Sequence, residues 1–423
     1  MGIIQFARES RSVLYAIDFR PHRYVRQEHI DEILPCDDLN KWASAGGSTS
    51  YATGGDCLCS GSNHRSLKMV ANEGSDSYFR YDYQTQEGEL LDLTDGSGNP
   101  YKVIVVRVKI LPADGTIVNP QCSSSVQLKL NLWNDGYTNL SSNVIWQADM
   151  VAPSDDLPGW YEIPFPACEL DDSNNTDFSA IRYISIQFNA LGDKVGWVLD
   201  RILIFHPPNS VGGWILRTDG SNERALHVAE YAASKGVRIS FGINTLEVGT
   251  SGNLTAQQVR YIQQAGHEIC VYTRTNPTWF EKSYQQKVQA IETSMQWFRE
   301  NGIYPAGARH LCLSGLRGWT PADEENFKGK YGLVISGRPF IPRRLTSLWD
   351  ASRLDIKGFI DTGQIPDLNN QITKAENNKA IFVAGAHYAN DDQVGWIEDF
   401  IDAMVSSSLK NYTLDDVAMG RVQ

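Results

Sequence analysis

The stretch "LTAQQVRYIQQAGHEICVYTRTN" (Leu254–Asn276) decides the fold of the second half of the chain, because a helical pattern passes directly into a short apolar strand. Other segments repeat this design. Helices are expected at 221–236, 283–302 and 392–407, and strands at 213–218, 237–243, 268–273, 331–336 and 379–386. Alternating strands and helices predict a parallel sheet, here in a barrel-like α/β domain.

The first half of the chain has a different period. Between about Leu67 and Phe205, short β-rich runs alternate apolar and polar residues, as in Leu128 and Leu130 against Lys129, and turn residues separate them. The runs lie at 101–111, 126–133, 143–151, 160–165, 181–190 and 196–205. Six such strands without a helical run predict an antiparallel β-sandwich.

The change of period sets the domain boundaries. "HPPNSVGG" (His206–Gly213) has the composition of a linker. We therefore predict an N-terminal arm at 1–35, a β-sandwich at 36–206, a linker at 207–213 and an α/β barrel at 214–423. The arm fits neither periodic pattern, and we expect it to attach the protein to a neighbouring subunit.

Composition and charge exclude several classes of protein. The chain has 38 Lys and Arg against 50 Asp and Glu, a formal charge of −12, so it is a poor ligand for a nucleic-acid backbone. No apolar signal-peptide core and no run of 18 apolar residues occurs, so neither secretion by a signal peptide nor membrane insertion is expected. The seven cysteines show no C-x-x-C spacing, which favours thiols in a reducing cytosol.

Polar motifs follow the predicted strands, where an α/β barrel places its chemistry. They are "RTDGS" (217–221), "VYTRTN" (271–276), "ARHLC" (308–312) and "GAHYAND" (385–391). In this order they resemble the polysaccharide deacetylase family, carbohydrate esterase family four, from about Trp214 to Ala418. The resemblance implies a distorted (β/α) barrel and metal-dependent removal of acetyl groups from bacterial or chitin-like polysaccharides.

The two metal-binding motifs of that family are altered here. The family's T-F-D-D-G motif supplies a base and a metal ligand, and the matching residues are Thr218 and Asp219. Its two metal-binding histidines correspond to Tyr272 and Asn276. A phenol and an amide are weak ligands for a transition metal, and a hydroxyl is a poor base. An alternative metal site that uses His267, Glu268 or His310 stays open.

Two further family residues are retained. Arg309 matches the arginine of the third motif, and His387 matches the histidine that acts as general acid. The alternatives are a hydrogen-bonded structural role for His387 and an N-cap role for Asp219. Because the base and two metal ligands are missing, we expect no catalytic residue and no metal in the barrel. Asp219, Arg309 and His387 would then be vestiges of an active site.

A silent scaffold can still bind sugar, because aromatic faces stack on sugar rings beside polar donors. The candidate ligand-binding residues are Tyr272, Asn276, Trp279, Trp319, Tyr388, Trp133 and Trp160. The alternative for each aromatic residue is a place in a hydrophobic core, which we expect for Trp146 and Trp197.

The predicted sandwich resembles jelly-roll carbohydrate-binding modules. The resemblance rests on "CDDLNKW" (36–42), "SLKM" (66–69), "SYFRYDY" (77–83) and "GWVLDRILIF" (196–205). Many such modules hold a structural calcium ion through an Asp of the last strand. Here Asp200 would bind it with Asp37 or Asp38. We expect no other cofactor.

A sandwich before a deacetylase-like barrel, with an N-terminal arm, resembles bacteriophage tail fibres, tailspikes and baseplate proteins. The leading hypothesis is a tail-associated protein, made in the host cytoplasm and present in several copies, that binds bacterial surface polysaccharide without catalysis. Neighbouring tail subunits would bind residues 1–35. The alternatives are an active deacetylase with replaced metal ligands and a purely structural virion protein.

Overall fold

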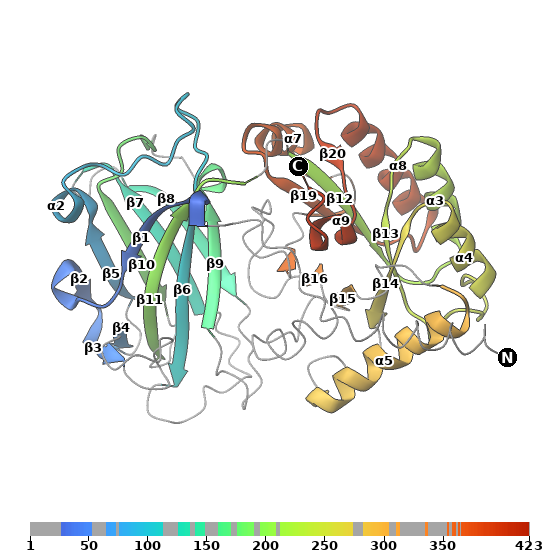
Figure 1. Ribbon diagram of the computed structural model, residues 1–423, viewed down its shortest axis with the longest axis horizontal. Coiled ribbons are helices and arrows are strands. Elements are labelled where there is room, and N and C mark those ends of the chain that lie inside the picture. Colours follow the sequence, from blue (N-terminus) through green and yellow to red (C-terminus); the bar gives the residue numbers. More distant parts are fainter. Residues whose placement is uncertain are drawn as a thin grey trace, which may run out of the picture.

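The structure is a computed structural model of the 423-residue chain. It describes residues 27–52, 65–72, 76–112, 126–135, 140–148, 160–170, 176–189, 195–208, 212–273, 282–303, 310–313, 335–336, 353–354, 358–360, 363 and 365–422. Two β-sheets form the N-terminal part, and a parallel sheet with helices forms the C-terminal part (Figure 1).

The N-terminal part consists of two antiparallel sheets. The first has the order β3-β4-β11-β6-β9 with β1 also paired to β11, and the second has the order β2-β5-β10-β7-β8. Its strands are β1 (Ile30–Pro35), β2 (Trp42–Ala45), β3 (Gly47–Ala52), β4 (Ser66–Ala71), β5 (Asp76–Asp82), β6 (Val103–Pro112), β7 (Val126–Trp133), β8 (Leu140–Ala148), β9 (Trp160–Pro166), β10 (Tyr183–Asn189) and β11 (Val195–Phe205). One short helix, α2 (Tyr83–Glu87), follows β5. All six predicted strands are confirmed.

Alternation along the strands builds the core between these two sheets. Leu128, Leu130 and Leu132 of β7 are fully buried, as their period of two predicts. Trp197 of β11 is also fully buried, stacks on Phe188 at 5.1 Å and donates its indole N–H to Ser77 Oγ. The prediction of a core position for Trp197 is therefore confirmed. Trp146 lies in β8, but its side chain is outside the described residues.

The predicted boundary of the N-terminal arm is wrong by one strand. Residues Ile30–Pro35, assigned to the arm, form β1 and pair antiparallel with β11 over Arg201–Phe205. The apolar residues of "IDEILP" explain this, since Leu34 enters the sandwich core. Residues 1–26 lie outside the described part of the chain.

The C-terminal part has a parallel sheet of order β15-β14-β13-β12-β19-β18, and β20 pairs with β12. Its strands are β12 (Gly213–Asp219), β13 (Ser240–Ile243), β14 (Glu268–Thr273), β15 (Leu311–Leu313), β18 (Gly358–Phe359), β19 (Ile381–Ala386) and β20 (Lys410–Asn411). A separate parallel pair joins β16 (Ile335–Ser336) and β17 (Arg353–Leu354). The helices are α3 (Arg224–Ser234), α4 (Ala256–Gln264), α5 (Tyr284–Glu300), α7 (Leu368–Asn377), α8 (Asp391–Val405) and α9 (Leu414–Ala418). The predicted strand–helix alternation is confirmed.

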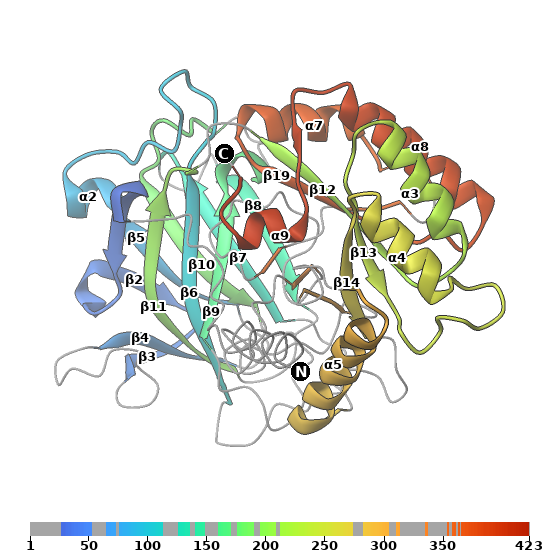
Figure 2. The same cartoon turned by 45° about the vertical axis from the view of Figure 1, so that its right-hand side comes forward.

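The two faces of the parallel sheet have different partners. Trp214 and Leu216 of β12 belong to the core that includes apolar residues of α3, α4, α5, α7 and α8. Ile215 of the same strand packs instead with residues of α9 such as Leu414. Figure 2 shows α3, α4 and α8 along one side of β12 and β13, and α9 on the other. Arg217 and Asp219 therefore share the face of Ile215, because side chains alternate along a strand.

The stretch Leu254–Thr273 folds as its sequence predicts. Thr255 caps α4 in a reciprocal capping box with Gln258, and Val259 and Ile262 enter the core. Gly266 has a φ of +97°, so it reverses the chain where a side chain would be strained. The next residues enter β14, which pairs in parallel with β13 and β15.

None of the helices in the described ranges is long and apolar enough to span a membrane. Cys36, Cys168, Cys270 and Cys312 are thiols rather than disulfides. The other three cysteines lie outside the described residues.

Candidate functional site

A buried ion pair lies at the carboxyl end of β12. The guanidinium Nη1 of Arg217 donates to Oδ2 of Asp219, two residues further along the strand. Arg217 is 0% exposed and Asp219 is 5% exposed. Asp219, the expected remnant of a metal site, therefore has an internal cation beside it.

The electrostatics keep the guanidinium of Arg217 charged. Burial alone would lower the pKa of Arg217, but the carboxylate of Asp219, followed by Cys312 and Tyr272, raises that pKa above its usual value. A guanidinium with a raised pKa stays charged at every physiological pH. The positive charge beside Asp219 is thus part of the protein.

Tyr272 and His387 complete the described part of this site. Tyr272 is 6% exposed and lies in register with Cys312 of the neighbouring strand β15. His387 directly follows β19, and its Nε2 lies 3.8 Å from Asp219 Oδ2. Its side chain is 41% exposed, so it connects the buried pair to the surface. The structure therefore brings Asp219, Tyr272 and His387 together around Arg217, and we call these four residues the mouth site.

A glycine makes room for the mouth site. Gly242 of β13 lies beside Asp219, and a Cβ atom there would approach Asp219 Oδ1 to 3.0 Å and Cys312 Cβ to 3.1 Å. The absence of a side chain at position 242 therefore allows the carboxylate to pack closely between β12 and β15.

The mouth site does not fit the divalent metal of the deacetylase family. Asp219 faces a guanidinium that would repel a second cation, and Tyr272 offers a phenol where the family has a histidine. The alternative role of Asp219 as a helix N-cap is wrong. Helix α3 begins at Arg224, and the Asn222 side chain accepts the Arg224 N–H.

The remaining predicted site residues, which include the vestigial Arg309 and the other ligand-binding candidates, are placed differently. Arg309, Asn276, Trp279 and Trp319 lie outside the described residues, as does the side chain of Trp160, which begins β9. Tyr388 and Trp133 are buried, at 1% and 8% exposure, so neither presents an exposed ring face. The hydroxyl of Tyr388 donates to Gly220 O, and burial raises its pKa.

The proposed calcium ligands lie in the sandwich. Asp200 is buried at the irregularity of β11 between its pairings with β4 and β1, and Ser66 Oγ donates to its Oδ1 at 2.7 Å. Asp38 instead caps a short 3₁₀ turn (Leu39–Lys41) through the Asn40 N–H. Each carboxylate thus has a local hydrogen bond, and the calcium site stays a prediction.

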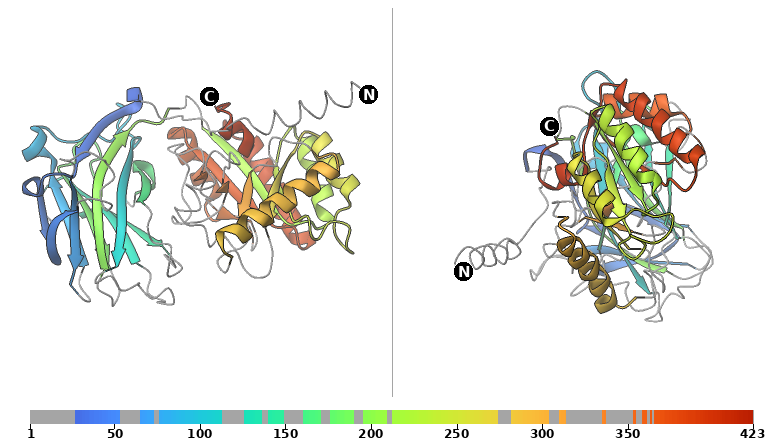
Figure 3. Two further views of the ribbon diagram at one scale, coloured as in Figure 1. Left: turned by 60° about the horizontal axis from the view of Figure 1, so that its bottom comes forward. Right: turned by 90° about the vertical axis from the view of Figure 1, so that its right-hand side faces the viewer.

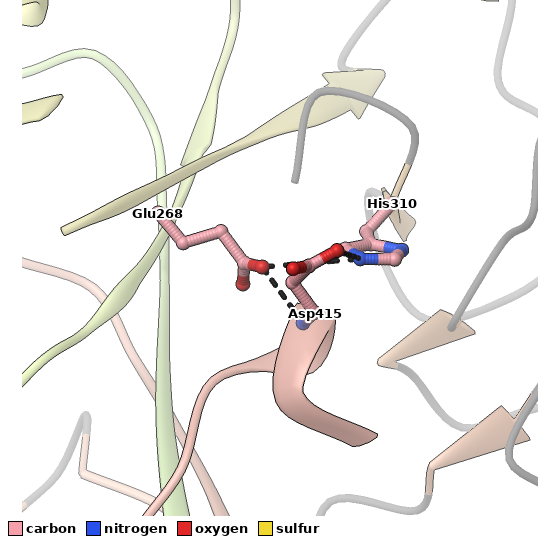
Figure 4. A group of neighbouring side chains, drawn as sticks. All are labelled: Glu268, His310 and Asp415. Carbon is pink, nitrogen blue, oxygen red and sulfur yellow. Dashed lines mark hydrogen bonds and ion pairs between the residues drawn. The ribbon is translucent and has the colours of Figure 1, made fainter. Parts of the chain in front are cut away.

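A second polar group lies at the amino ends of the parallel strands. Glu268 begins β14, His310 directly precedes β15, and Asp415 lies in α9; their side chains point toward one another (Figure 4). Among the described residues, this is the group of Asp, Glu, His and Cys whose ligand atoms all lie within 4.8 Å of one another. His267, also considered as a ligand, points elsewhere, with Nε2 2.9 Å from Ala229 O.

Two residues of these groups were not predicted from the sequence. Arg217 stands two positions before Asp219 in the apolar run "GWILRTD", so strand alternation could have predicted that the two share a face. Asp415 carried no such signal, because its position beside β14 depends on how the chain folds back after β20.

A shallow cleft lies between α7, α8 and the segment after β18. It has a volume of about 260 Å³, and its lining includes Trp396, Asp367 and Asp399. Ile360 and Phe400 contribute apolar surface. The combination of an aromatic ring, carboxylates and an apolar floor is typical of a sugar-binding surface.

No known family model matches the chain, and neither does any curated protein. Solved structures with similarity include the peptidoglycan deacetylase PdaC from Bacillus subtilis, with 10% identity, a TM-score of 0.33 and coverage of 50% of this chain and 94% of that chain. A putative polysaccharide deacetylase from Mycobacterium smegmatis has 10% identity, a TM-score of 0.39 and coverage of 50% and 91%. A family 4 acetyl xylan esterase from Clostridium thermocellum, in complex with a cobalt ion, has 16% identity, a TM-score of 0.33 and coverage of 49% and 91%. These similarities fall in about half of the chain.

Proposed function

We propose that the protein binds polysaccharide on a deacetylase-type barrel that does not remove acetyl groups. The observation that carries this proposal is the buried pair of Arg217 and Asp219. A guanidinium of the protein itself supplies the positive charge that the family obtains from a metal ion.

The chemistry of deacetylation supports a silent site. The reaction needs a polarised carbonyl, an activated water and an acid for the leaving group. Asp219 is engaged by Arg217, and Thr218, at the position of the family's base, is a buried hydroxyl. A hydroxyl without an activating base cannot accept the proton of water near neutral pH. His387 alone does not supply the other two functions.

Two surfaces support sugar binding. At the mouth site, the partly exposed His387 can donate to or accept from a sugar hydroxyl, with the charged pair behind it. The cleft between α7 and α8 is lined by an aromatic residue, Trp396, and by two acidic residues, Asp367 and Asp399. The first surface is favoured because it lies at the strand ends where barrels of this kind bind ligands.

The test combines acetate release with glycan binding. Purified protein is incubated with acetylated chitin oligosaccharides, acetylxylan and peptidoglycan, with zinc or cobalt added, and acetate is measured. Binding is measured on immobilised bacterial surface polysaccharides. We expect no acetate above the buffer blank and saturable binding to at least one polysaccharide.

Two variants assign the binding surface. His387→Ala should weaken binding roughly tenfold, the loss expected for one hydrogen bond to a partly buried group. Trp396→Ala is the matched control at the cleft and should leave affinity within about twofold. Steady turnover that depends on Asp219 would contradict the proposal and favour an active deacetylase. Absence of binding to every polysaccharide would favour a purely structural protein.

For the setting of the protein, we propose a bacteriophage tail, in which residues 1–26 attach to a neighbouring subunit. The support is the order of the parts, with a sandwich before the deacetylase-type barrel. Mass spectrometry of purified particles would detect the chain at several copies per virion. Its absence from particles, with the protein recovered only from lysate, would overturn this assignment.

A further inference from the structure

We propose that Glu268, His310 and Asp415 bind one zinc-like divalent metal ion that fastens α9 to the parallel sheet. The three ligand atoms are Glu268 Oε1, His310 Nε2 and Asp415 Oδ1, from three separate elements (Figure 4). All three residues are buried. An imidazole with two carboxylates is a ligand set found at zinc and related ions.

The distances between the ligand atoms suit a shared ion. His310 Nε2 lies 3.5 Å from Asp415 Oδ1 and 3.8 Å from Glu268 Oε1. Both separations exceed the roughly 2.7–3.2 Å of a good N–H···O hydrogen bond. Two ligands of a tetrahedral ion with bonds of about 2.1 Å are about 3.4 Å apart. A small inward movement of the three side chains would therefore bring them to bonding distance of one ion.

Charged side chains surround the three proposed ligands. Three buried carboxylates, Glu268, Asp415 and Asp416, face the guanidinium groups of Arg421 and Arg238. A cation shared by two buried carboxylates lowers the repulsion between them. A proton on His310 or on Glu268 is the competing explanation, and the experiment below separates the two.

Outer hydrogen bonds orient the two carboxylates toward His310. Arg421 donates to Asp415 Oδ2, while Ser240 Oγ and the Leu414 N–H donate to Glu268 Oε2. The Asp415 N–H donates to Glu268 Oε1 at 2.7 Å. This bond uses one of the two lone-pair directions of Oε1. Such supporting bonds are usual around metal ligands and fix their orientation.

This site is separate from the mouth site. Glu268 begins β14 and Tyr272 lies four residues further along, so the two ends are about 13 Å apart at about 3.3 Å per residue. His310 is 0% exposed, which leaves no approach for a polysaccharide. The ion would stabilise the fold by joining β14, the start of β15 and α9. The proposal is therefore independent of the proposed function.

The experiment measures zinc in the tag-free full-length chain. The protein is treated with a chelator, dialysed against a slight excess of zinc and then against zinc-free buffer, and its zinc content and melting temperature are determined. We expect one zinc per chain and a higher melting temperature than that of the chelated protein. X-ray absorption of the zinc-loaded wild type should show one imidazole and otherwise oxygen ligands.

Variants assign the zinc to this group. His310→Gln should bind zinc at least about tenfold more weakly. His227→Gln, at an exposed histidine of α3, is the matched control and should keep full zinc content. Asp219→Asn should also keep it, which separates this site from the mouth site. Failure of the wild type to retain zinc, or retention by folded His310→Gln, would overturn the proposal and leave a network of ion pairs. If His310→Gln does not fold, the absorption spectrum of the wild type decides, and a spectrum without imidazole overturns the proposal.

Discussion

At the carboxyl ends of the parallel strands, Asp219 lies against a guanidinium from its own strand, whereas at the amino ends Glu268 and Asp415 lie on two sides of an imidazole. Both groups of carboxylates belong to the part built on the parallel sheet, which Figure 3 shows from two further sides, and Asp415 itself lies in α9. At the mouth site the compensating charge is built into the chain. At the other end, the proposed metal ion would supply it. We therefore propose that only the amino ends of the strands take up a metal ion.

The largest effect is expected when the buried ion pair of Arg217 and Asp219 in the mouth site is broken. Arg217→Ala leaves Asp219 buried without its cation and should lower the free energy of unfolding by about 3–5 kcal/mol, measured by urea denaturation. The control is the double variant Arg217→Met with Asp219→Asn, which removes both charges and should recover much of the loss. Equal free energies of unfolding for the single and double variants would show that an unpaired charge on Asp219 is not the cause of the loss.

Removal of metal tests the proposed zinc site at the amino ends of the parallel strands. Zinc at 100 times its dissociation constant should raise the free energy of unfolding by about 2.7 kcal/mol over the chelated protein. The Arg217→Met, Asp219→Asn variant should show the same increase, since its changes lie at the carboxyl end of β12 and the proposed zinc site lies at the amino ends of the strands. A zinc-dependent increase that the Arg217→Met, Asp219→Asn variant loses would place the metal at the mouth site instead.

A smaller effect tests the packing of the mouth. Gly242→Ala should cost about 1–3 kcal/mol, because the new methyl group would meet Asp219, Thr218 and Cys312 at 3.0–3.1 Å. Gly395→Ala is the matched control, since Gly395 lies inside α8 and a methyl group there would meet no atom within 4 Å. That change should stabilise the protein by about 0.5–1 kcal/mol in thermal unfolding.

The smallest expected effect concerns a partly exposed ion pair, Arg182 with Asp82, which contrasts with the buried pair of Arg217 and Asp219. Asp82 of the sandwich caps α2 and accepts from Arg182 at 3.3 Å. Burial would raise its pKa, but Arg182 and the Thr85 N–H lower it overall. The stabilisation is therefore present above the unfolded pKa of about 4 and is lost as pH falls through the lower folded value. Asp82→Asn should cost about 1 kcal/mol at pH 7, and this cost should fall as pH is lowered below the unfolded pKa of about 4. A cost that does not change with pH would contradict this account.

The sequence predicted the elements better than the site. Periodicity located the six strands of the sandwich and the α4–β14 passage, because burial repeats at two or 3.6 residues. It missed β1, since six residues next to a charged segment give a weak pattern. The altered motifs named Asp219, Tyr272 and His387; His387 Nε2 lies 3.8 Å from Asp219 Oδ2, and Tyr272 acts on Arg217. Asp415 could not be predicted, because its contact with Glu268 spans 147 residues and depends on the complete fold.

The most direct test of the comparison is anomalous X-ray scattering at the zinc edge from crystals soaked in zinc. We expect a peak among Glu268, His310 and Asp415 and none beside Asp219. A peak between Asp219 Oδ2 and His387, with Arg217 displaced and no density at His310, would contradict the comparison.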